Sequence, residues 1–217
     1  MKIFFVRHGE SIFKGVRHQL SETPLSDRGF RQANRVASFL NQIPIDLIIS
    51  STLTRSLQTA EAIKRLKKVP FTQNDLFIER KMPSLFLGKL IDDPKISEIH
   101  QEIRKHFFEP LWHYAGEENF TDLLTRVNES LEYIITQKKE NVVVISHGYF
   151  MSVIFFSIVF GKAYPQSFGH FRHHTEISNG GISLCEYKDN MWKLITLNEC
   201  SHLILSPSTQ DASKNSL

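Results

Sequence analysis

Two runs of apolar residues in this 217-residue chain end in a histidine followed by a glycine. One run closes with Arg7-His8-Gly9 and the other with Ser146-His147-Gly148. If both runs are parallel strands of one sheet, the two histidines emerge at the same carboxyl edge, where open α/β sheets bind ligands. A single such histidine is more often a strand end or a hydrogen-bonded core residue. Together, the two junctions predict an active-site pair.

Two arginines can add positive charge to this pair. Arg7 precedes His8, and its guanidinium offers a planar fork of donors that matches phosphate or carboxylate. Arg55 lies in the first turn of a predicted helix, where a positive charge opposes the helix dipole unless an anion is bound there. The alternatives are a surface ion pair for Arg7 and a tolerated, exposed side chain for Arg55. Two arginines with His147 as a further cation favour a site for a dianion such as a phosphoryl group.

The elements that must position these residues follow from apolar periodicity. Consecutive apolar residues, which indicate cover on both faces, predict strands at 2–6, 45–49 and 141–145. A shorter strand is predicted at 69–75 and a hairpin at 180–187 and 192–197. Helices are predicted from Ser26-Asp27 to Pro44, from the capping hydroxyls of Ser50-Ser51-Thr52 to Lys67, at 118–137 and after Gly148.

This order predicts an α/β fold, a three-layer sandwich with a mostly parallel central sheet and helices on both faces. We expect one domain over residues 1–205, followed by a flexible tail at 206–217. The polar segment 10–23 is expected to form a loop over the site. The irregular segment 77–115, which contains Pro83, Pro94 and Pro110, is expected to be an excursion with one or two helices that covers the site.

Composition argues against several classes of protein. The net charge of +3 comes without a basic stripe, so we expect no nucleic-acid partner. Cys185 and Cys200 lack metal or redox spacing, which favours buried free thiols in a reducing compartment. The amino-terminal apolar run is too short for a signal peptide. The uncharged stretch 142–160 is broken by Ser146-His147-Gly148, which favours a buried strand and helix over a membrane span. We therefore expect a cytoplasmic protein.

With these residues in view, the chain resembles the histidine phosphatase superfamily in its phosphoglycerate mutase-like branch. The resemblance rests on Arg7-His8-Gly9-Glu10-Ser11, on the segment containing Arg55, and on Ile145-Ser146-His147-Gly148. Secondary matches are Thr23-Pro24-Leu25-Ser26 with Gly29 and Gln32-Ala33, Gly116-Glu117-Glu118 with Arg126-Val127, and Ser201-His202-Leu203. They extend over residues 3–203 in the family's order, which implies a phosphoglycerate mutase-like fold.

The resemblance implies that His8 is the nucleophile and becomes a phosphohistidine. Arg7, Arg55 and His147 would bind the phosphoryl oxygens, and Glu79 would donate a proton to the leaving oxygen. It implies no metal and no cofactor, and a small phosphate ester as substrate. Nearby arginines are expected to keep His8 neutral, as a nucleophile requires. The further substrate-binding residues that we expect are Glu10, Ser11, Lys14 and Gly148. For Glu79 the alternative is a surface carboxylate paired with Arg80 or Lys81.

Two departures from the family's pattern bear on the reaction. Lys14 stands where mutases of this branch carry an asparagine, and Glu79-Arg80-Lys81-Met82-Pro83 replaces their glycine-containing acid motif. We therefore expect a phosphoric monoester hydrolase of the histidine acid phosphatase type, independent of metal. The alternatives are a cofactor-dependent phosphoglycerate mutase and a catalytically weak module that binds phosphorylated ligands. The basic residues Lys14, Arg17, Arg80 and Lys81 favour a substrate with an additional acidic group, and a homodimer is compatible with the sequence.

Two aromatic or histidine-rich segments have simpler interpretations. Residues 170–174, with three histidines, lack a carboxylate or cysteine to complete a metal site and are predicted to be a polar loop. Trp112, His113 and Tyr114 either line the substrate entrance or pack the excursion onto the core.

Overall fold

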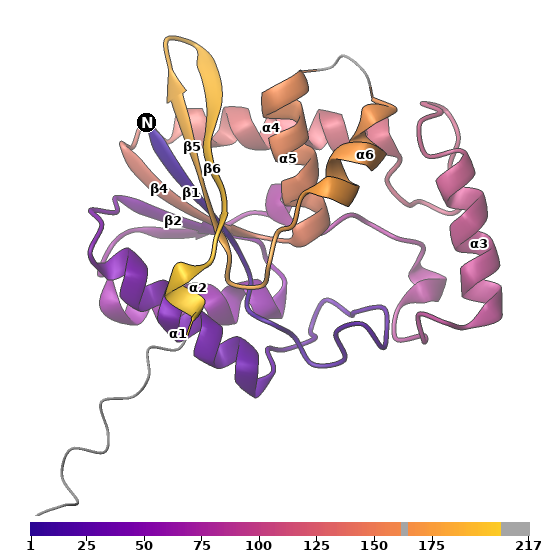
Figure 1. Ribbon diagram of the computed structural model, residues 1–217, viewed down its shortest axis with the longest axis horizontal. Coiled ribbons are helices and arrows are strands. Elements are labelled where there is room, and N and C mark those ends of the chain that lie inside the picture. The colour runs from indigo at the N-terminus through magenta and orange to yellow at the C-terminus, as the bar shows by residue number, and fades with distance from the viewer. Residues whose placement is uncertain (162–164, 205–217) are drawn as a thin grey trace, which may run out of the picture.

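A computed structural model of the protein describes residues 1–161 and 165–204, and its centre is a six-stranded sheet (Figure 1). The strands are β1 (Lys2–Arg7), β2 (Leu47–Ser50), β3 (Phe71–Gln73), β4 (Asn141–Ser146), β5 (Ile182–Lys188) and β6 (Met191–Glu199). Their order is β3-β2-β4-β1-β5-β6, with parallel pairing from β3 to β1 and antiparallel pairing for β5 and β6. The tail predicted at 206–217 lies outside the described residues.

Helices cover both faces of this sheet. The α-helices among the described residues are α1 (Asp27–Asn41), α2 (Thr54–Leu66), α3 (Pro94–Lys105), α4 (Phe120–Thr136), α5 (Gly148–Phe160) and α6 (Ser167–His174). Side chains alternate along β1, so Ile3 and Phe5 pack into a core with α4 and α5, whereas Phe4 and Val6 pack against α1 and α2. Figure 1 shows these two helical layers on opposite sides of the sheet. The predicted three-layer α/β sandwich is confirmed.

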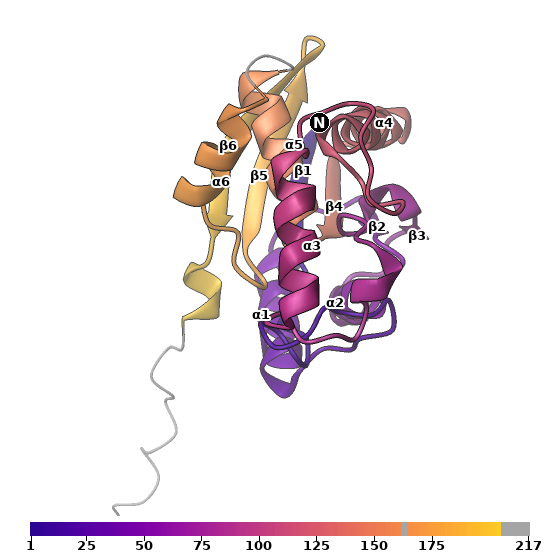
Figure 2. The same ribbon diagram turned by 90° about the vertical axis from the view of Figure 1, so that its right-hand side faces the viewer.

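Helix α3 stands apart from the two helical layers, at the right of Figure 1, and faces the viewer in Figure 2. It buries Ile96 and Ile103 in a small apolar cluster with Phe86, and Trp112 packs against the same cluster. Trp112 therefore packs within the excursion itself. The sequence had left open whether it packs the excursion onto the core or lines the substrate entrance. Within the described residues, no helix has both the length and the apolar character that crossing a bilayer requires.

The structure corrects three local predictions. The hydroxyls of residues 50–52 do not cap α2, whose N-cap is Leu53 without a side-chain hydrogen bond. Phe30 has the spacing of a core residue but is 44% exposed. Its neighbour Gly29 takes the buried position, because α1 lies so close to the Glu10 backbone that a Cβ on Gly29 would meet the Glu10 carbonyl oxygen. Residues 170–174, predicted as a loop, lie in α6.

Candidate active site

His8 and His147 follow the adjacent parallel strands β1 and β4 at the same edge of the sheet. Arg7 pairs with Ser146 in the strand register, which brings the two following residues side by side. The ring centroids of His8 and His147 are 4.9 Å apart, and both side chains are buried. The structure thus brings together the two histidines whose pairing the sequence predicts.

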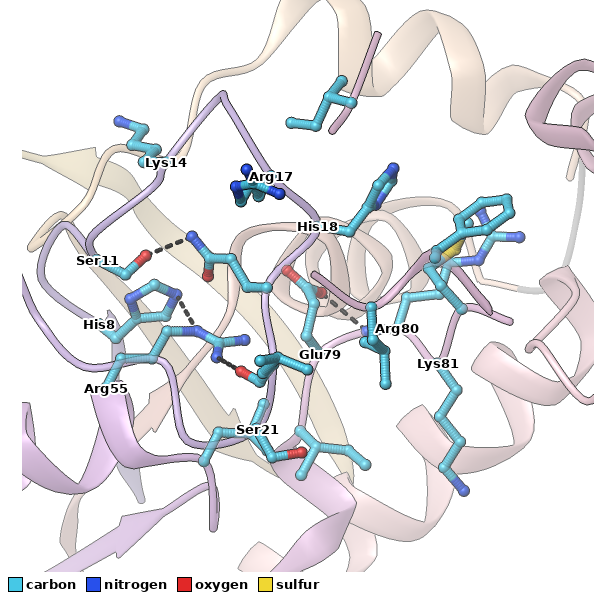
Figure 3. A pocket seen from close by; sticks show the side chains of 18 of the residues that line it. His8, Ser11, Lys14, Arg17, His18, Ser21, Arg55, Glu79, Arg80 and Lys81 are labelled. Carbon is cyan, nitrogen blue, oxygen red and sulfur yellow. Dashed lines mark hydrogen bonds between the residues drawn. The ribbon is translucent and has the colours of Figure 1, made fainter. Parts of the chain in front are cut away.

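The hydrogen bonds of the His8 ring define which of its nitrogens carries the proton. Nδ1 lies 2.6 Å from the carbonyl oxygen of Gly9, which can only accept a hydrogen bond, so Nδ1 carries the hydrogen and Nε2 carries the lone pair. Arg55 Nε donates to this Nε2 at 3.3 Å (Figure 3). Burial, followed by the charges of Arg55 and Arg7, holds the pKa of His8 well below its usual value. The ring is therefore neutral, as expected for a nucleophile.

The backbone around His8 is held tightly by its neighbours. The side chain of Asn179 donates to the His8 carbonyl at 3.0 Å, and Gly9 N–H donates to Thr59 Oγ1 at 3.1 Å. A Cβ on Gly9 would lie 2.4 Å from the carbonyl oxygen of Gly29, so the turn after β1 needs glycine. This close packing fixes the direction in which Nε2 points.

Arg7 and Arg55 approach the histidines from two sides. Arg55 is 4% exposed, and its Nη1 donates to the Leu20 carbonyl at 3.2 Å. Arg7 donates through Nη1 to the Ile177 carbonyl and lies against Gly148, where a Cβ would come 2.9 Å from the guanidinium carbon. Burial lowers the pKa of both arginines, but a guanidinium remains protonated in proteins. The two arginines therefore place fixed positive charge beside His8.

His147 differs from the prediction that it is a cation. Its pKa lies well below its usual value because of burial, with the neighbouring His8 and Arg55 as further causes. The ring is neutral in the unliganded protein. Nε2 lies 2.8 Å from Ser51 Oγ and 3.2 Å from Ser56 Oγ, and Nδ1 is buried without a hydrogen-bond partner among the described residues. A dianion in the site would oppose the repulsion that keeps this ring uncharged.

Glu79 lies at the amino end of α5, which starts directly after His147. Its Oε1 accepts from the N–H of Phe150 at 3.0 Å, and its Oε2 from the N–H of Tyr149 at 3.2 Å. Arg80 contributes only its backbone N–H to the Glu79 carboxylate, at 2.9 Å. Within residues 1–161 and 165–204, no ion pair joins Glu79 to the side chain of Arg80 or Lys81, so that alternative is wrong.

A cavity of about 460 Å³ opens onto these residues and is hereafter called the phosphoryl cavity. Arg7, His8, Arg55 and Glu79 line it together. The loop 11–21 and the segment 78–91 form its walls. Figure 3 shows Glu79 pointing into the space beside the His8–Arg55 pair. The cavity therefore brings together an imidazole, two guanidinium groups and a carboxyl group.

Of the other predicted substrate-binding residues, the structure places only some in the phosphoryl cavity. Ser11 and Lys14 line the phosphoryl cavity, with Ser11 Oγ accepting from Gln19 at 2.5 Å. Gly148 lies behind Arg7. Glu10 faces a neighbouring cavity, where its carboxylate accepts from Ser26 at 3.1 Å and lies 3.9 Å from the Lys14 ammonium. Glu10 therefore does not line the cavity that contains His8 and Glu79.

Sequence reasoning missed the residues that hold Glu79 in place. Arg126 on α4 donates through Nη1 to the carbonyl oxygens of Leu76 and Ile78, at 3.0 and 2.8 Å. Ser146 Oγ donates to the carbonyl of Phe77 at 2.7 Å. The sequence analysis noted that Arg126 matches the family's pattern, but nothing in the sequence indicated that it would position Glu79. These bonds anchor the segment that ends in Glu79.

Possible metal ligands do not gather in the part of the chain that the structure describes, where no group of three or more His, Cys, Asp or Glu side chains could hold an ion. His170 and His174 lie together on α6, with ring centroids 4.1 Å apart. The two cysteines are free thiols; Cys185 is buried, and Cys200 is only half-buried. Burial raises the pKa of Cys185 to about 12.

Comparison with known proteins agrees with this geometry. Residues 3–200 match the model of the histidine phosphatase superfamily, branch 1. The chain is 24% identical over 216 residues to the probable phosphoglycerate mutase GpmB of Proteus mirabilis, covering 94% of this chain and 95% of that protein. It is 31% identical over 151 residues to phosphoserine phosphatase 1 of Hydrogenobacter thermophilus, covering 68% and 71%. The solved structure of Bacillus stearothermophilus YhfR is similar with a TM-score of 0.81 at 20% identity, covering 94% of this chain and 99% of that one.

Proposed function

This chain belongs to the histidine phosphatase superfamily, and we propose that it hydrolyses phosphomonoesters through a phosphohistidine formed on His8. The observation that carries the proposal is the state of the His8 ring. Its Nδ1–H is engaged by the Gly9 carbonyl, and its Nε2 lone pair lies beside the Arg55 guanidinium in an open cavity. A neutral, oriented imidazole next to fixed cations is what attack on a phosphoryl group requires.

In the first proposed step, His8 Nε2 attacks the phosphorus atom and the bond from phosphorus to the ester oxygen breaks. Glu79, in its protonated form, gives its proton to the departing oxygen, which leaves as an alcohol. Arg7 and Arg55 stabilise the charge on the equatorial phosphoryl oxygens, which is the main demand of phosphoryl transfer. We assign His147, through its unpaired Nδ1, to the same oxygens.

In the second proposed step, water replaces the alcohol. The Glu79 carboxylate takes a proton from the water as its oxygen attacks phosphorus, the bond from phosphorus to Nε2 breaks, and inorganic phosphate leaves. Glu79 is protonated again and His8 is neutral again, so the cycle closes. One carboxyl group serves both steps because the alcohol and the water occupy the same side of the phosphoryl group.

The proposal favours a phosphatase of the histidine acid phosphatase type acting on a small substrate. A cavity of about 460 Å³ matches a small-molecule ligand. A mutase would keep the phosphoryl group and return it to a second oxygen of the same substrate. Because the chain is similar to a probable phosphoglycerate mutase of Proteus mirabilis, the experiment also tests this alternative. The position of Glu79 in the cavity counts against a silent binding module, because it supplies the acid that turnover needs. A cytoplasmic location remains part of this proposal.

The experiment measures hydrolysis of p-nitrophenyl phosphate in the presence of EDTA by the wild type and by His8→Ala, with His106→Ala as the matched control. We expect His106→Ala to retain activity and His8→Ala to lose at least about a thousandfold in kcat. Rapid quenching with a labelled substrate should trap acid-labile phosphate on the wild type only. Equal activity of His8→Ala, or loss of wild-type activity in EDTA, contradicts the mechanism. Interconversion of phosphoglycerates faster than phosphate release would instead establish the mutase.

A further inference from the structure

A second cavity, of about 620 Å³, adjoins the phosphoryl cavity around Glu79 and is hereafter called the distal cavity. Residues that line both cavities include His18, Glu79 and Arg80. In the proposed reaction Glu79 protonates the leaving oxygen, so the part of the substrate attached to that oxygen extends past Glu79. The distal cavity is therefore the space available to the leaving group.

Arg80 occupies the boundary between the two cavities. Its Nε donates to the Glu118 carbonyl at 2.9 Å, and its guanidinium lies 4.3 Å from the ring centroid of Phe107 and 5.2 Å from that of Tyr149. Among the described residues, its Nη2 is buried without a hydrogen-bond partner. Buried donors are rarely left unpaired, so the end of Arg80 has capacity for an acceptor.

Arg172 approaches the same aromatic ring from α6. Its guanidinium lies 4.5 Å from the ring centroid of Tyr149, and the residue lines the distal cavity. Tyr149 thus orders two guanidinium groups, Arg80 and Arg172, at one ring. Aromatic contact restricts their rotamers, which lowers the entropy that a bound anion would have to remove.

Two imidazoles complete the distal cavity. His18 and His100 both line it, and each has a buried nitrogen without a partner among the described residues, Nε2 and Nδ1 respectively. Burial lowers the pKa of both rings, so they are neutral near pH 7 and can donate one N–H each. They add hydrogen-bonding capacity without adding charge.

Among the described residues, no carboxylate forms an ion pair with Arg80 or Arg172. Glu79 and Glu176 line the distal cavity, but Glu79 is held by backbone N–H groups for the proton transfer. Glu176 is exposed and accepts from Ser178 Oγ at 2.7 Å. The other basic residues noted in the sequence, Lys14, Arg17 and Lys81, line the phosphoryl cavity and not the distal cavity. Arg17 is exposed and donates to the Gly88 carbonyl, and Lys81 points away from His8 (Figure 3).

We propose that Arg80 and Arg172 form an anion subsite for the leaving group, so that the preferred substrates are phosphomonoesters with a second acidic group. This proposal rests on the proposed function, because it uses Glu79 to define the side of the leaving group. A carboxylate and a second phosphate share the chemistry that a guanidinium fork recognises. The subsite selects the acidic group by charge and by the position of the two arginines.

The test uses three esters with the same carbon chain: n-propyl phosphate, 3-phosphooxypropanoate and propane-1,3-diol bisphosphate. Their affinities are measured by calorimetry on His8→Ala, which binds without turnover, and their kcat/KM values on the active protein. Each measurement is repeated with Arg80→Gln and Arg172→Gln, and with Arg65→Gln as the control. Arg65 is an exposed arginine on α2 that pairs with Glu61 at 3.9 Å, outside both cavities.

We expect the two acidic esters to be preferred over n-propyl phosphate by about tenfold to a hundredfold, the size of a charged hydrogen bond. Arg172→Gln, an exposed change that spares the core, and Arg80→Gln should each remove most of this preference. In Arg172→Gln, which lies outside the phosphoryl cavity, kcat/KM for n-propyl phosphate should change less than about threefold. Of the two acidic esters, the one with the higher kcat/KM shows whether the subsite prefers a carboxylate or a second phosphate.

Two failures are distinguishable. Turnover through His8 with equal use of all three esters, or a preference that survives both Arg80→Gln and Arg172→Gln, overturns the subsite and leaves the phosphatase standing. Preferential binding of the acidic esters to His8→Ala without turnover by the wild type supports the subsite and overturns the phosphatase.

Discussion

Glu118 and Arg126 form a two-pronged buried ion pair beneath the segment that carries Glu79. Arg126 Nε lies 2.6 Å from Glu118 Oε1, and Nη2 lies 2.7 Å from Oε2. Glu118 Oε2 also accepts from the backbone N–H of Lys81 at 2.8 Å, while Arg126 holds the carbonyl of Ile78 on the other side of Glu79. The pair therefore fixes the chain on both sides of the candidate acid.

The first prediction concerns this ion pair. Glu118→Gln leaves the Arg126 charge buried without its partner, so we expect the free energy of unfolding to fall by about 3–5 kcal/mol. Glu132→Gln, an exposed change on the same helix, should alter it by less than about 0.5 kcal/mol. Urea unfolding of both variants measures the difference. A positioning role also predicts that hydrolysis of alkyl phosphates falls more than hydrolysis of p-nitrophenyl phosphate, and an equal loss would indicate a purely structural role.

The second prediction tests Glu79 as the proton donor. Glu79→Gln cannot give a proton to the leaving oxygen, so kcat for an alkyl phosphate should fall by about 10²–10⁴. p-Nitrophenolate leaves without protonation, so the first step with that ester should be less affected. Single-turnover kinetics on both esters separates the steps. The assignment of Glu79 is wrong if both esters slow by the same factor in formation of the phosphoenzyme.

The third prediction uses the close approach of Gly148 to Arg7. A Cβ on Gly148 would lie 2.9 Å from the guanidinium carbon of Arg7, a flexible group that can move aside. Gly148→Ala should therefore weaken inhibition by inorganic phosphate by about tenfold, while the unfolding midpoint changes little. Gly169→Ala on α6, where a Cβ meets nothing within 4 Å, is the matched control and should leave phosphate inhibition unchanged. Unaltered phosphate affinity of Gly148→Ala would show that Arg7 is not a phosphate ligand.

The sequence predicted the backbone of this site better than its electrostatics. Parallel pairing of two apolar runs was enough to bring His8 and His147 to one sheet edge, because residues after adjacent parallel strands emerge together. The neutrality of His147 could not be predicted, since it depends on complete burial beside Arg55. The contacts of the Glu10 carboxylate with Ser26 and Lys14 could not be predicted either, because they depend on the path of a loop that has no periodic pattern.

The last prediction follows from the lowered pKa values of His8 and His147. Below about pH 6.5 the unfolded chain binds protons at these rings, whereas the folded protein does not. The free energy of unfolding is therefore highest above that pH and decreases as the pH falls. Between pH 7 and pH 5 each ring should reduce the free energy of unfolding by up to about 2 kcal/mol. His147→Gln should remove its share of this pH dependence, and His106→Gln should retain it. The lowered pKa of Glu117 acts in the same direction but only below about pH 4.5. Urea unfolding at the two pH values measures the slopes, and parallel slopes for wild type and His147→Gln would mean that folding does not lower the pKa of His147.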